Sequence, residues 1–395
     1  MVSHTPTATH DQTIVFAGGG TGGHLYPALA IADAFRGLLR QVRFVFFVSQ
    51  RAIDGRILDG TGCELMRQSL LPLSGIPWRW PRILASFRRS SLLCRSRISA
   101  SRVAVVIGTG GFTSVPAVCE ARRVGIPTVL LNPDAIPGKA NRLLASIADR
   151  VFVQWEDTLA RLPRRASAEV LGCAIRPDFL NPHRTKGLER FGLDPQLQTL
   201  LVTGASQGAR TVNEAVIANL SYLQLRDDWQ VLHLTGEQDF EKVDSAYRGT
   251  SIRACVMRFT GHMADALAAA DLVVSRAGAS TLAEITAVGV PAVLMPYPYH
   301  KDMHQLANAR CLERTNAAKI VHDAVDPVVN GPALRHALEP LMTDSEHRAA
   351  MASAARGIGH PRAAERIARE IVSLAGERGV LLHSHSVEES CESAR

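Results

Sequence analysis

Short apolar runs alternate with longer amphipathic segments along the whole chain. In the first half the apolar runs cover residues 13–17, 43–48, 103–107, 125–131 and 150–154. Longer segments lie between these runs, and some of them, such as 25–39, have apolar residues at helical spacing. Short apolar runs bounded by turn residues predict buried strands, and strands alternating with helices predict a parallel sheet.

The second half repeats this pattern, with apolar runs at 200–203, 231–235, 254–259 and 272–274. Both halves also contain a strand, a glycine loop, a helix, a Gly-Ile-Pro or Gly-Val-Pro turn and another strand. The sequence therefore predicts an α/β fold of two doubly wound domains that face one another. A last helix is expected at 351–374, and the final residues, 377–395, have the composition of a disordered tail.

Composition restricts the class of protein. With 395 residues, 46% hydrophobic and 21% charged, the chain is long enough for two globular domains. Its formal net charge of +7 favours an anionic partner, which could be nucleic acid, acidic lipid or a phosphorylated substrate. The scattered cysteines, without a Cys-x-x-Cys pair, indicate a reducing cytoplasm and argue against a zinc site. The chain has no apolar run of bilayer length and no signal-peptide core, so any membrane contact is expected to be peripheral.

A glycine-rich loop joins the first predicted strand to the first predicted helix. Its sequence, GGGTGGH, ends at His24. Glycines let backbone N–H groups approach a diphosphate closely, because no side chains stand in the way. Local pattern alone leaves two roles open for His24, a structural residue at the start of a helix or a catalytic group.

A second candidate phosphate site lies within 271–309, which predicts strand, tight turn, helix, strand and helix. A helix that begins after such a turn has free N–H groups and a positive dipole end that attract phosphate. Glu284, expected in the first turn, could accept both hydroxyls of a ribose. Thr281 and Glu284 also fit a capping box, so the pattern does not decide between ligand and cap.

The stretch 73–102 is basic and aromatic and contains no acidic residue. Arginines with interleaved aromatic rings suit an anionic lipid surface. The residues expected to contact lipid are Trp78, Trp80, Ile83, Phe87, Arg88 and Arg89. An amphipathic core helix with a solvated basic face is the alternative, and RNA binding is a further one, although no RNA-recognition motif accompanies the charge.

Several spaced motifs together resemble the MurG family. They are RxGAxTxxE at 276–284, DxHQxxNA at 302–309, GGTGGH at 19–24, the glycine loop at 108–114 and GASQGAR at 204–210. This resemblance covers nearly all of 14–375. Members of the family are inverting glycosyltransferases with the GT-B fold, two Rossmann-like domains around a central cleft. They move N-acetylglucosamine from UDP-N-acetylglucosamine to the 4-hydroxyl of the N-acetylmuramyl unit of lipid I, making lipid II for peptidoglycan.

The resemblance implies a domain arrangement and a location. Residues 13–175 would form the acceptor and membrane-associated domain, 176–198 the linker, 199–358 the donor domain, and 359–376 a helix crossing back to the first domain. The partners would be UDP-N-acetylglucosamine, lipid I and an anionic membrane surface on the cytoplasmic face of the inner membrane, with no nucleic acid. No Asp-x-Asp motif occurs, so neither a metal nor another cofactor is expected.

The resemblance also assigns residues to the site. Expected donor-binding residues are Thr21, Gly22, Gly23, Arg176, Ser206, Gln207, Gly208, Thr260, Ala279, Ser280, Glu284, His304 and Gln305. Expected acceptor-binding residues are Gly19, Gly20, Gly110, Gly111, Thr113, Ser114 and Asn141. His24 and Asp134 are the candidates for the catalytic base, and an imidazole is the better proton acceptor near neutral pH.

The chain departs from the family pattern in one loop. The family commonly has His-Glu-Gln-Asn where this chain has Leu131, Asn132, Pro133 and Asp134, while Pro137, Gly138 and Asn141 agree with the pattern. A carboxylate thus replaces an amide in the expected acceptor cleft.

Other functions also fit the sequence. A related lipid glycosyltransferase, such as a diacylglycerol galactosyltransferase, would use the same nucleotide fold. A non-enzymatic nucleotide-sugar or RNA-binding module would use the glycine loops for phosphate only. An NAD-dependent oxidoreductase is disfavoured, because GGTGGH lacks the Gly-x-Gly-x-x-Gly spacing and the ribose-binding acid.

Overall fold

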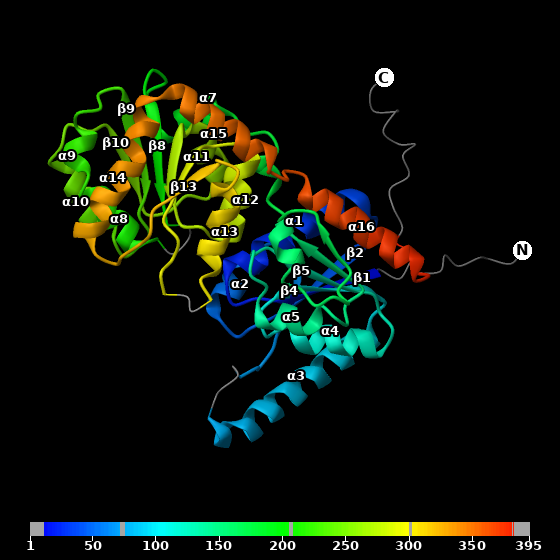
Figure 1. The fold of residues 1–395 in the computed structure, drawn as a ribbon. Helices are drawn as coiled ribbons and strands as arrows, with labels where there is room; N and C mark the ends of the chain where they lie inside the picture. Colours follow the sequence, from blue (N-terminus) through cyan, green and yellow to red (C-terminus); the bar gives the residue numbers. More distant parts are fainter. Residues whose placement is uncertain (1–11, 72–75, 205–207, 300–301, 381, 383–395) are drawn as a thin grey trace, which may run out of the picture.

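The chain forms two parallel sheets, one in each half, each covered by helices (Figure 1). The computed structural model describes residues 12–71, 76–204, 208–299, 302–380 and 382. This arrangement confirms the α/β fold of two doubly wound units.

The first sheet has the strand order β3-β2-β1-β4-β5-β6-β7, and all its pairings are parallel. Its strands are β1 (Gln12–Gly18), β2 (Val42–Val48), β3 (Glu64–Arg67), β4 (Val103–Gly110), β5 (Thr128–Asn132), β6 (Arg150–Val153) and β7 (Ala168–Val170). The accompanying helices are α1 (Gly22–Leu38), α2 (Ala52–Leu58), η1 (Pro77–Arg79), α3 (Trp80–Ala100), α4 (Ser114–Arg123), α5 (Lys139–Leu144) and α6 (Glu156–Leu159). Phe16 and Phe46 pack in the core on one face, and Val15 and Phe47 pack in the core on the other. Burial on both faces explains why these strands are continuous apolar runs.

The second sheet has the order β10-β9-β8-β11-β12-β13, also parallel throughout. Its strands are β8 (Gln198–Thr203), β9 (Trp229–Leu234), β10 (Ala254–Met257), β11 (Leu272–Ser275), β12 (Ala292–Leu294) and β13 (Ala318–Ile320). The helices that accompany it are η2 (Pro177–Phe179), α7 (Arg184–Phe191), α8 (Arg210–Ile217), α9 (Leu220–Leu223), α10 (Phe240–Arg248), α11 (Met263–Ala269), α12 (Ala279–Val288), α13 (His304–Glu313), α14 (Pro327–Thr343) and α15 (Ser345–Gly357). The chain continues into a last helix, α16 (Ala363–Glu377).

Strand order places the glycine loops where ligands bind in such folds. The sequential order of strands reverses between β1 and β4 in the first sheet and between β8 and β11 in the second. The loops after these four strands contain the predicted glycine motifs. A crevice outside the carboxyl ends of the strands at such a switch point is the usual ligand site of an open α/β sheet.

The segment 351–374, expected to be helical, is divided between two helices. Helix α15 ends at Gly357 and α16 begins at Ala363, with Pro361 in the break. Proline lacks the N–H that a continuous helix needs. After the break, α16 lies along α1 (Figure 1), and its Ile367 and Ile371 belong to the first half's core. The chain thus returns to its first half at the end.

Candidate functional site

Helix α12 presents an open N-terminus at the carboxyl edge of the second sheet. Gly278 is its N-cap, and no side chain among the described residues accepts a capping hydrogen bond there. Ala279 and Ser280 form the start of the helix, and the Ser280 hydroxyl is buried beside the Cys173 thiol. Free N–H groups and the positive end of the helix dipole can therefore meet an anion here.

Glu284 does not cap this helix. Because α12 begins at Ala279, Glu284 lies in the second turn, and Thr281 is not the N-cap. The predicted first-turn position and the capping-box alternative are both wrong. Burial raises the pKa of the Glu284 carboxyl to about 7; Arg176 opposes that shift and Asp178 adds to it. A half-buried acid that titrates near neutrality is typical of a functional site.

Arg176 joins Glu284 to the segment after β10. Its Nη1 donates to the carbonyl of Gly261 at 3.3 Å, and the arginine also acts electrostatically on Glu284. Thr260 is buried, and its hydroxyl accepts from the backbone N–H of His262 at 3.0 Å. Tertiary folding therefore gathers Arg176, Thr260 and Glu284, three predicted donor residues from distant parts of the sequence.

The glycine loop after β8 is partly described. Ser206 and Gln207 lie outside the described residues. Gly208 has φ +73°, and a Cβ there would lie 2.5 Å from the carbonyl oxygen of Thr235. Only glycine fits at this position without strain.

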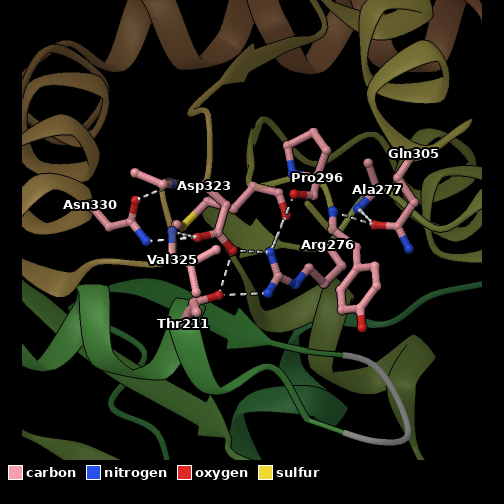
Figure 2. Close-up of polar contacts among 11 residues, drawn as sticks. Thr211, Arg276, Ala277, Pro296, Gln305, Asp323, Val325 and Asn330 are labelled. Atoms are coloured by element: carbon pink, nitrogen blue, oxygen red, sulfur yellow. Dashed lines mark hydrogen bonds and ion pairs between the residues drawn. The ribbon is translucent and has the colours of Figure 1, made fainter. Parts of the chain in front are cut away.

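The loop after β12 is held by the two predicted residues at the start of α13. His304 Nδ1 lies 2.9 Å from Oδ1 of Asp302, and this histidine lowers the pKa of the Asp302 carboxyl. Gln305 Oε1 accepts from the N–H groups of Tyr297 at 2.9 Å and Ala277 at 3.3 Å. Figure 2 shows Gln305 beside Ala277. In this conformation the Gln305 oxygen supports the loops.

Asp54 organises the first glycine loop, a role that the sequence pattern did not reveal. Its buried carboxylate accepts from the N–H of Gly20 at 2.7 Å and from the N–H of Ser49 at 3.0 Å. A Cβ at Gly19 would lie 2.8 Å from Asp54 Oδ2, so the glycine permits this close approach. The Gly20 N–H, expected to face a ligand, is therefore already bonded here.

His24 points its second ring nitrogen at the other glycine loop of the first sheet. Nδ1 lies 3.0 Å from the carbonyl oxygen of Gly19. A carbonyl can only accept, so Nδ1 carries the proton in the neutral ring and Nε2 has the free lone pair. A Cβ at Gly110 would lie 3.0 Å from Nε2, so the absence of a side chain leaves room beside that nitrogen. This geometry suits a general base.

Other predicted residues on this side lie near His24 or support the loops. Thr21 is the N-cap of α1, which begins with Gly22 and Gly23, and its hydroxyl lies 3.4 Å from His24 Nδ1. Gly110 and Gly111 both have positive φ, at +107° and +74°.

Three predicted acceptor residues are buried in this conformation, namely Thr113, Ser114 and Asn141. Ser114 donates to the carbonyl of Gly111 at 2.8 Å, and Asn141 donates to that of Leu131 at 2.9 Å. The Ser114 hydroxyl and the Asn141 Nδ2 therefore support their loops, while Asn141 Oδ1 is buried without a hydrogen-bond partner among the described residues.

Asp134 bonds across the two halves. Its Oδ1 accepts from Nδ2 of Asn308 on α13 at 2.8 Å, while Asn308 Oδ1 accepts from the N–H of Ala135 at 2.7 Å. The Asn308 side chain is fully buried. Asn308 lies within the DxHQxxNA motif, but the motif does not indicate that Asp134 is its partner.

Cys173 lies where the two halves meet. Burial raises the pKa of this thiol to about 12; the Ser280 hydroxyl lowers it in part, and the charges of Asp134 and Glu284 raise it. Cys173 also lines a pocket together with His24 and Asn132. Helix α1 contacts α12 at the same junction. The region around Cys173 is therefore bordered by His24 from the first half and by Ser280 and Glu284 from the second.

The predicted membrane residues lie on η1 and α3 and fall into an exposed and a buried group. Trp78, Trp80, Arg88 and Arg89 are exposed, as are Leu84 and Leu92. Ile83 is buried, and Phe87 packs on Phe112 with the ring centroids 6.3 Å apart. The expectation that Ile83 and Phe87 lie on a lipid-facing surface is therefore wrong, because the helix turns both toward the protein core. None of the helices formed by the described residues has the length and apolar character needed to cross a bilayer.

Comparisons with family models match both halves of the chain. The glycosyltransferase family 28 N-terminal domain matches residues 14–153, and the glycosyltransferase family 28 C-terminal domain matches residues 199–367. Together the two models cover most of both sheets.

Similar proteins agree with the models. The UDP-N-acetylglucosamine–N-acetylmuramyl-(pentapeptide) pyrophosphoryl-undecaprenol N-acetylglucosamine transferase of Thermodesulfovibrio yellowstonii is 35% identical, over 90% of this chain and 96% of its own length. The enzyme of the same name from Halothermothrix orenii is 37% identical, over 88% and 95%. A crystal structure of MurG from Acinetobacter baumannii superposes with a TM-score of 0.74 at 25% identity, covering 92% of this chain and 99% of that one. The similarity confirms the GT-B arrangement expected from the motifs.

Proposed function

The chain belongs to glycosyltransferase family 28, and from this premise we propose that it transfers N-acetylglucosamine from UDP-N-acetylglucosamine to the 4-hydroxyl of lipid I, making lipid II. The observation that carries the proposal is the junction of the two halves. There the free Nε2 of His24 and the Ser280–Glu284 face of α12 border one region.

In the proposed reaction His24 is the general base. Nε2 takes the proton of the acceptor's 4-hydroxyl as its oxygen bonds to the anomeric carbon, and the bond from that carbon to the UDP oxygen breaks with its electron pair. Attack from the face opposite UDP inverts the configuration. The Gly19 carbonyl, bonded to Nδ1, stabilises the imidazolium that forms.

The donor half would bind UDP in three places. Glu284 accepts the ribose hydroxyls, Arg176 and the backbone at Thr260 flank the uracil, and the start of α12 with the Gly208 loop faces the diphosphate. Free N–H groups at a helix start, near the developing charge, stabilise the departing UDP.

The direct test measures UDP release from UDP-N-acetylglucosamine with and without a lipid I analogue. We expect release that requires the analogue and a product carrying one added N-acetylglucosamine. Binding of the nucleotide sugar without turnover would reject the transferase in favour of a binding module. Preferred turnover of another UDP-sugar, or of diacylglycerol, would reject the donor or the acceptor assignment.

The exposed face of α3 would hold the first half on an anionic membrane surface at the cytoplasmic face. Trp78 in η1 and Trp80 at the start of α3 are exposed aromatic residues suited to the interface, and Arg88 and Arg89 are exposed on α3. Figure 1 shows one end of α3 extending away from the first sheet and its other helices. This position leaves the face accessible to a bilayer.

We expect neutralising both Arg88 and Arg89 with glutamine to weaken binding to anionic vesicles about tenfold or more at low salt, because each surface arginine contributes ~1 kcal/mol. Vesicle sedimentation over a salt series measures this loss. Glutamine at Arg164 and Arg165, which are also exposed, changes the net charge equally and should leave binding nearly unchanged. Equal binding of the unmodified protein to neutral and anionic vesicles would contradict the proposal.

A further inference from the structure

A buried ion pair lies at the carboxyl edge of the second sheet, one residue after β11. Arg276 is 8% exposed, and its Nη1 donates to Asp323 Oδ2 at 2.7 Å and to the carbonyl of Met295 at 2.9 Å. Its Nη2 donates to the hydroxyl of Thr211 at 2.6 Å. Figure 2 shows the guanidinium facing both Thr211 and Asp323. We refer to Arg276, Thr211, Asp323 and Asn330 as the Arg276 network.

Asp323 is bonded on both oxygens. Oδ2 also accepts from the Thr211 hydroxyl, and Oδ1 accepts from Asn330 Nδ2 and from the N–H of Val325, each at 2.8 Å. Burial by itself would raise the pKa of this carboxyl, but the bonds from Thr211, Arg276, Val325 and Asn330 together outweigh burial and lower it. The Asp323 carboxylate is therefore ionised at neutral pH, and its charge is matched by the guanidinium within the network.

The network joins four loops that lie far apart along the chain. Thr211 lies in the first turn of α8, just after the glycine loop of β8. Arg276 lies between β11 and α12, Met295 follows β12, and Asp323 follows β13. These four strands are consecutive neighbours in the sheet. One guanidinium thus ties together the loops at the ends of four adjacent strands.

A contribution to stability alone does not explain such a pair. Removing two charges from water costs several kcal/mol each, and apolar replacements of buried ion pairs are often as stable. What the pair supplies is fixed geometry, since a planar guanidinium donates in set directions. The starts of α8 and α12, the two helices that follow the proposed phosphate loops, are the elements held by this geometry.

We propose that the Arg276 network is a positioning device for the donor site, which fixes the start of α8 relative to the start of α12. The inference rests on the proposed function, because it assumes that the nucleotide diphosphate lies between these two helix starts. Arg276 acts through the loops, with its charge already matched by Asp323, and is a positioning residue rather than a catalytic one.

The test uses variants that change the network without removing its bulk. Thr211→Val deletes one hydroxyl, and Arg276→Lys keeps the charge but does not reach Thr211, Asp323 and Met295 together. We expect each to weaken UDP-N-acetylglucosamine binding about tenfold in calorimetry and to raise its KM similarly, with kcat and the KM for a lipid I analogue within twofold. Thr211→Ser restores the hydroxyl and should restore affinity.

A matched control separates positioning from stability. Thr286→Val deletes a buried hydroxyl on α12 that, among the described residues, bonds to two carbonyls of its own helix, those of Leu282 and Ala283. We expect its melting temperature to fall about as far as that of Thr211→Val, with donor affinity unchanged. When Thr211→Val and Arg276→Lys are combined, their losses of donor affinity should not add, because both substitutions break the same contacts.

The outcomes separate the two proposals. Unchanged donor affinity in folded Thr211→Val and Arg276→Lys proteins overturns the positioning role. Donor binding that responds to these variants, in a protein without transfer to lipid I, overturns the proposed function and keeps the positioning role. Absence of donor binding by the unmodified protein overturns both.

Discussion

Replacing His24 with alanine should lower turnover by about a hundredfold to ten-thousandfold and change donor affinity little, because a positioned general base contributes to the rate by this factor. The neutral ring donates from Nδ1 to the Gly19 carbonyl and leaves Nε2 free beside Gly110. Alanine removes that nitrogen and none of the proposed contacts of Glu284 or Arg176. Turnover by steady-state kinetics and UDP-N-acetylglucosamine affinity by calorimetry measure the two effects.

Asp134→Asn is the matched variant, because asparagine is the residue that the family commonly has at this position. The Asp134 carboxylate accepts from Asn308 across the two halves, and an asparagine oxygen can accept the same bond. We therefore expect this variant to keep substantial activity. If Asp134→Asn lost turnover with both substrates bound while His24→Ala kept it, the two residues would exchange roles.

Glu284→Gln should weaken UDP-N-acetylglucosamine binding about tenfold to a hundredfold, because hydrogen bonds to a carboxylate contribute roughly 1.5–3 kcal/mol. Since the pKa of Glu284 is about 7, the unmodified protein should bind the donor more tightly as the pH rises from 6 to 8. Glutamine does not titrate, so the slope should disappear in the variant. UDP-N-acetylglucosamine has no terminal phosphate that titrates in this range, which makes it a cleaner ligand than UDP.

The same substitution has the opposite effect on stability. Burial raises the pKa of Glu284 from 4.5 in the unfolded chain to about 7, so the folded protein binds the proton more tightly. Glu284 contributes roughly 3 kcal/mol to the free energy of unfolding below pH 4.5, and this contribution is lost as the pH rises through 7. Glu284→Gln should match the unmodified protein in melting temperature near pH 4.5 and exceed it at pH 8. Equal melting temperatures at both pH values, with equal donor affinity, would show that the Glu284 carboxylate neither binds the donor nor titrates near neutral pH.

The alternation of apolar runs and amphipathic segments, together with the glycine motifs, determined the architecture. Local periodicity is enough for this, because a strand buried on both faces must be apolar along its length, as in β1 and β4. The motifs also identified the family, and through it the residues expected around the donor. Local pattern failed at the end of α15, where packing and Pro361 end a segment that reads as helical, and on α3, where periodicity alone did not show that Ile83 faces the core.

Only the tertiary structure decided which side chains meet. Asp54 reaches Gly20, Asn308 reaches Asp134, and Arg276 reaches Asp323. Each contact joins segments that lie far apart in the chain and become neighbours through strand order and the docking of the two halves. The pKa of Glu284 depends on the same assembly, since burial and Arg176 come from outside its helix. Sequence motifs specify the chemistry available at each loop, whereas partners and charge states arise from distances that only the folded chain sets.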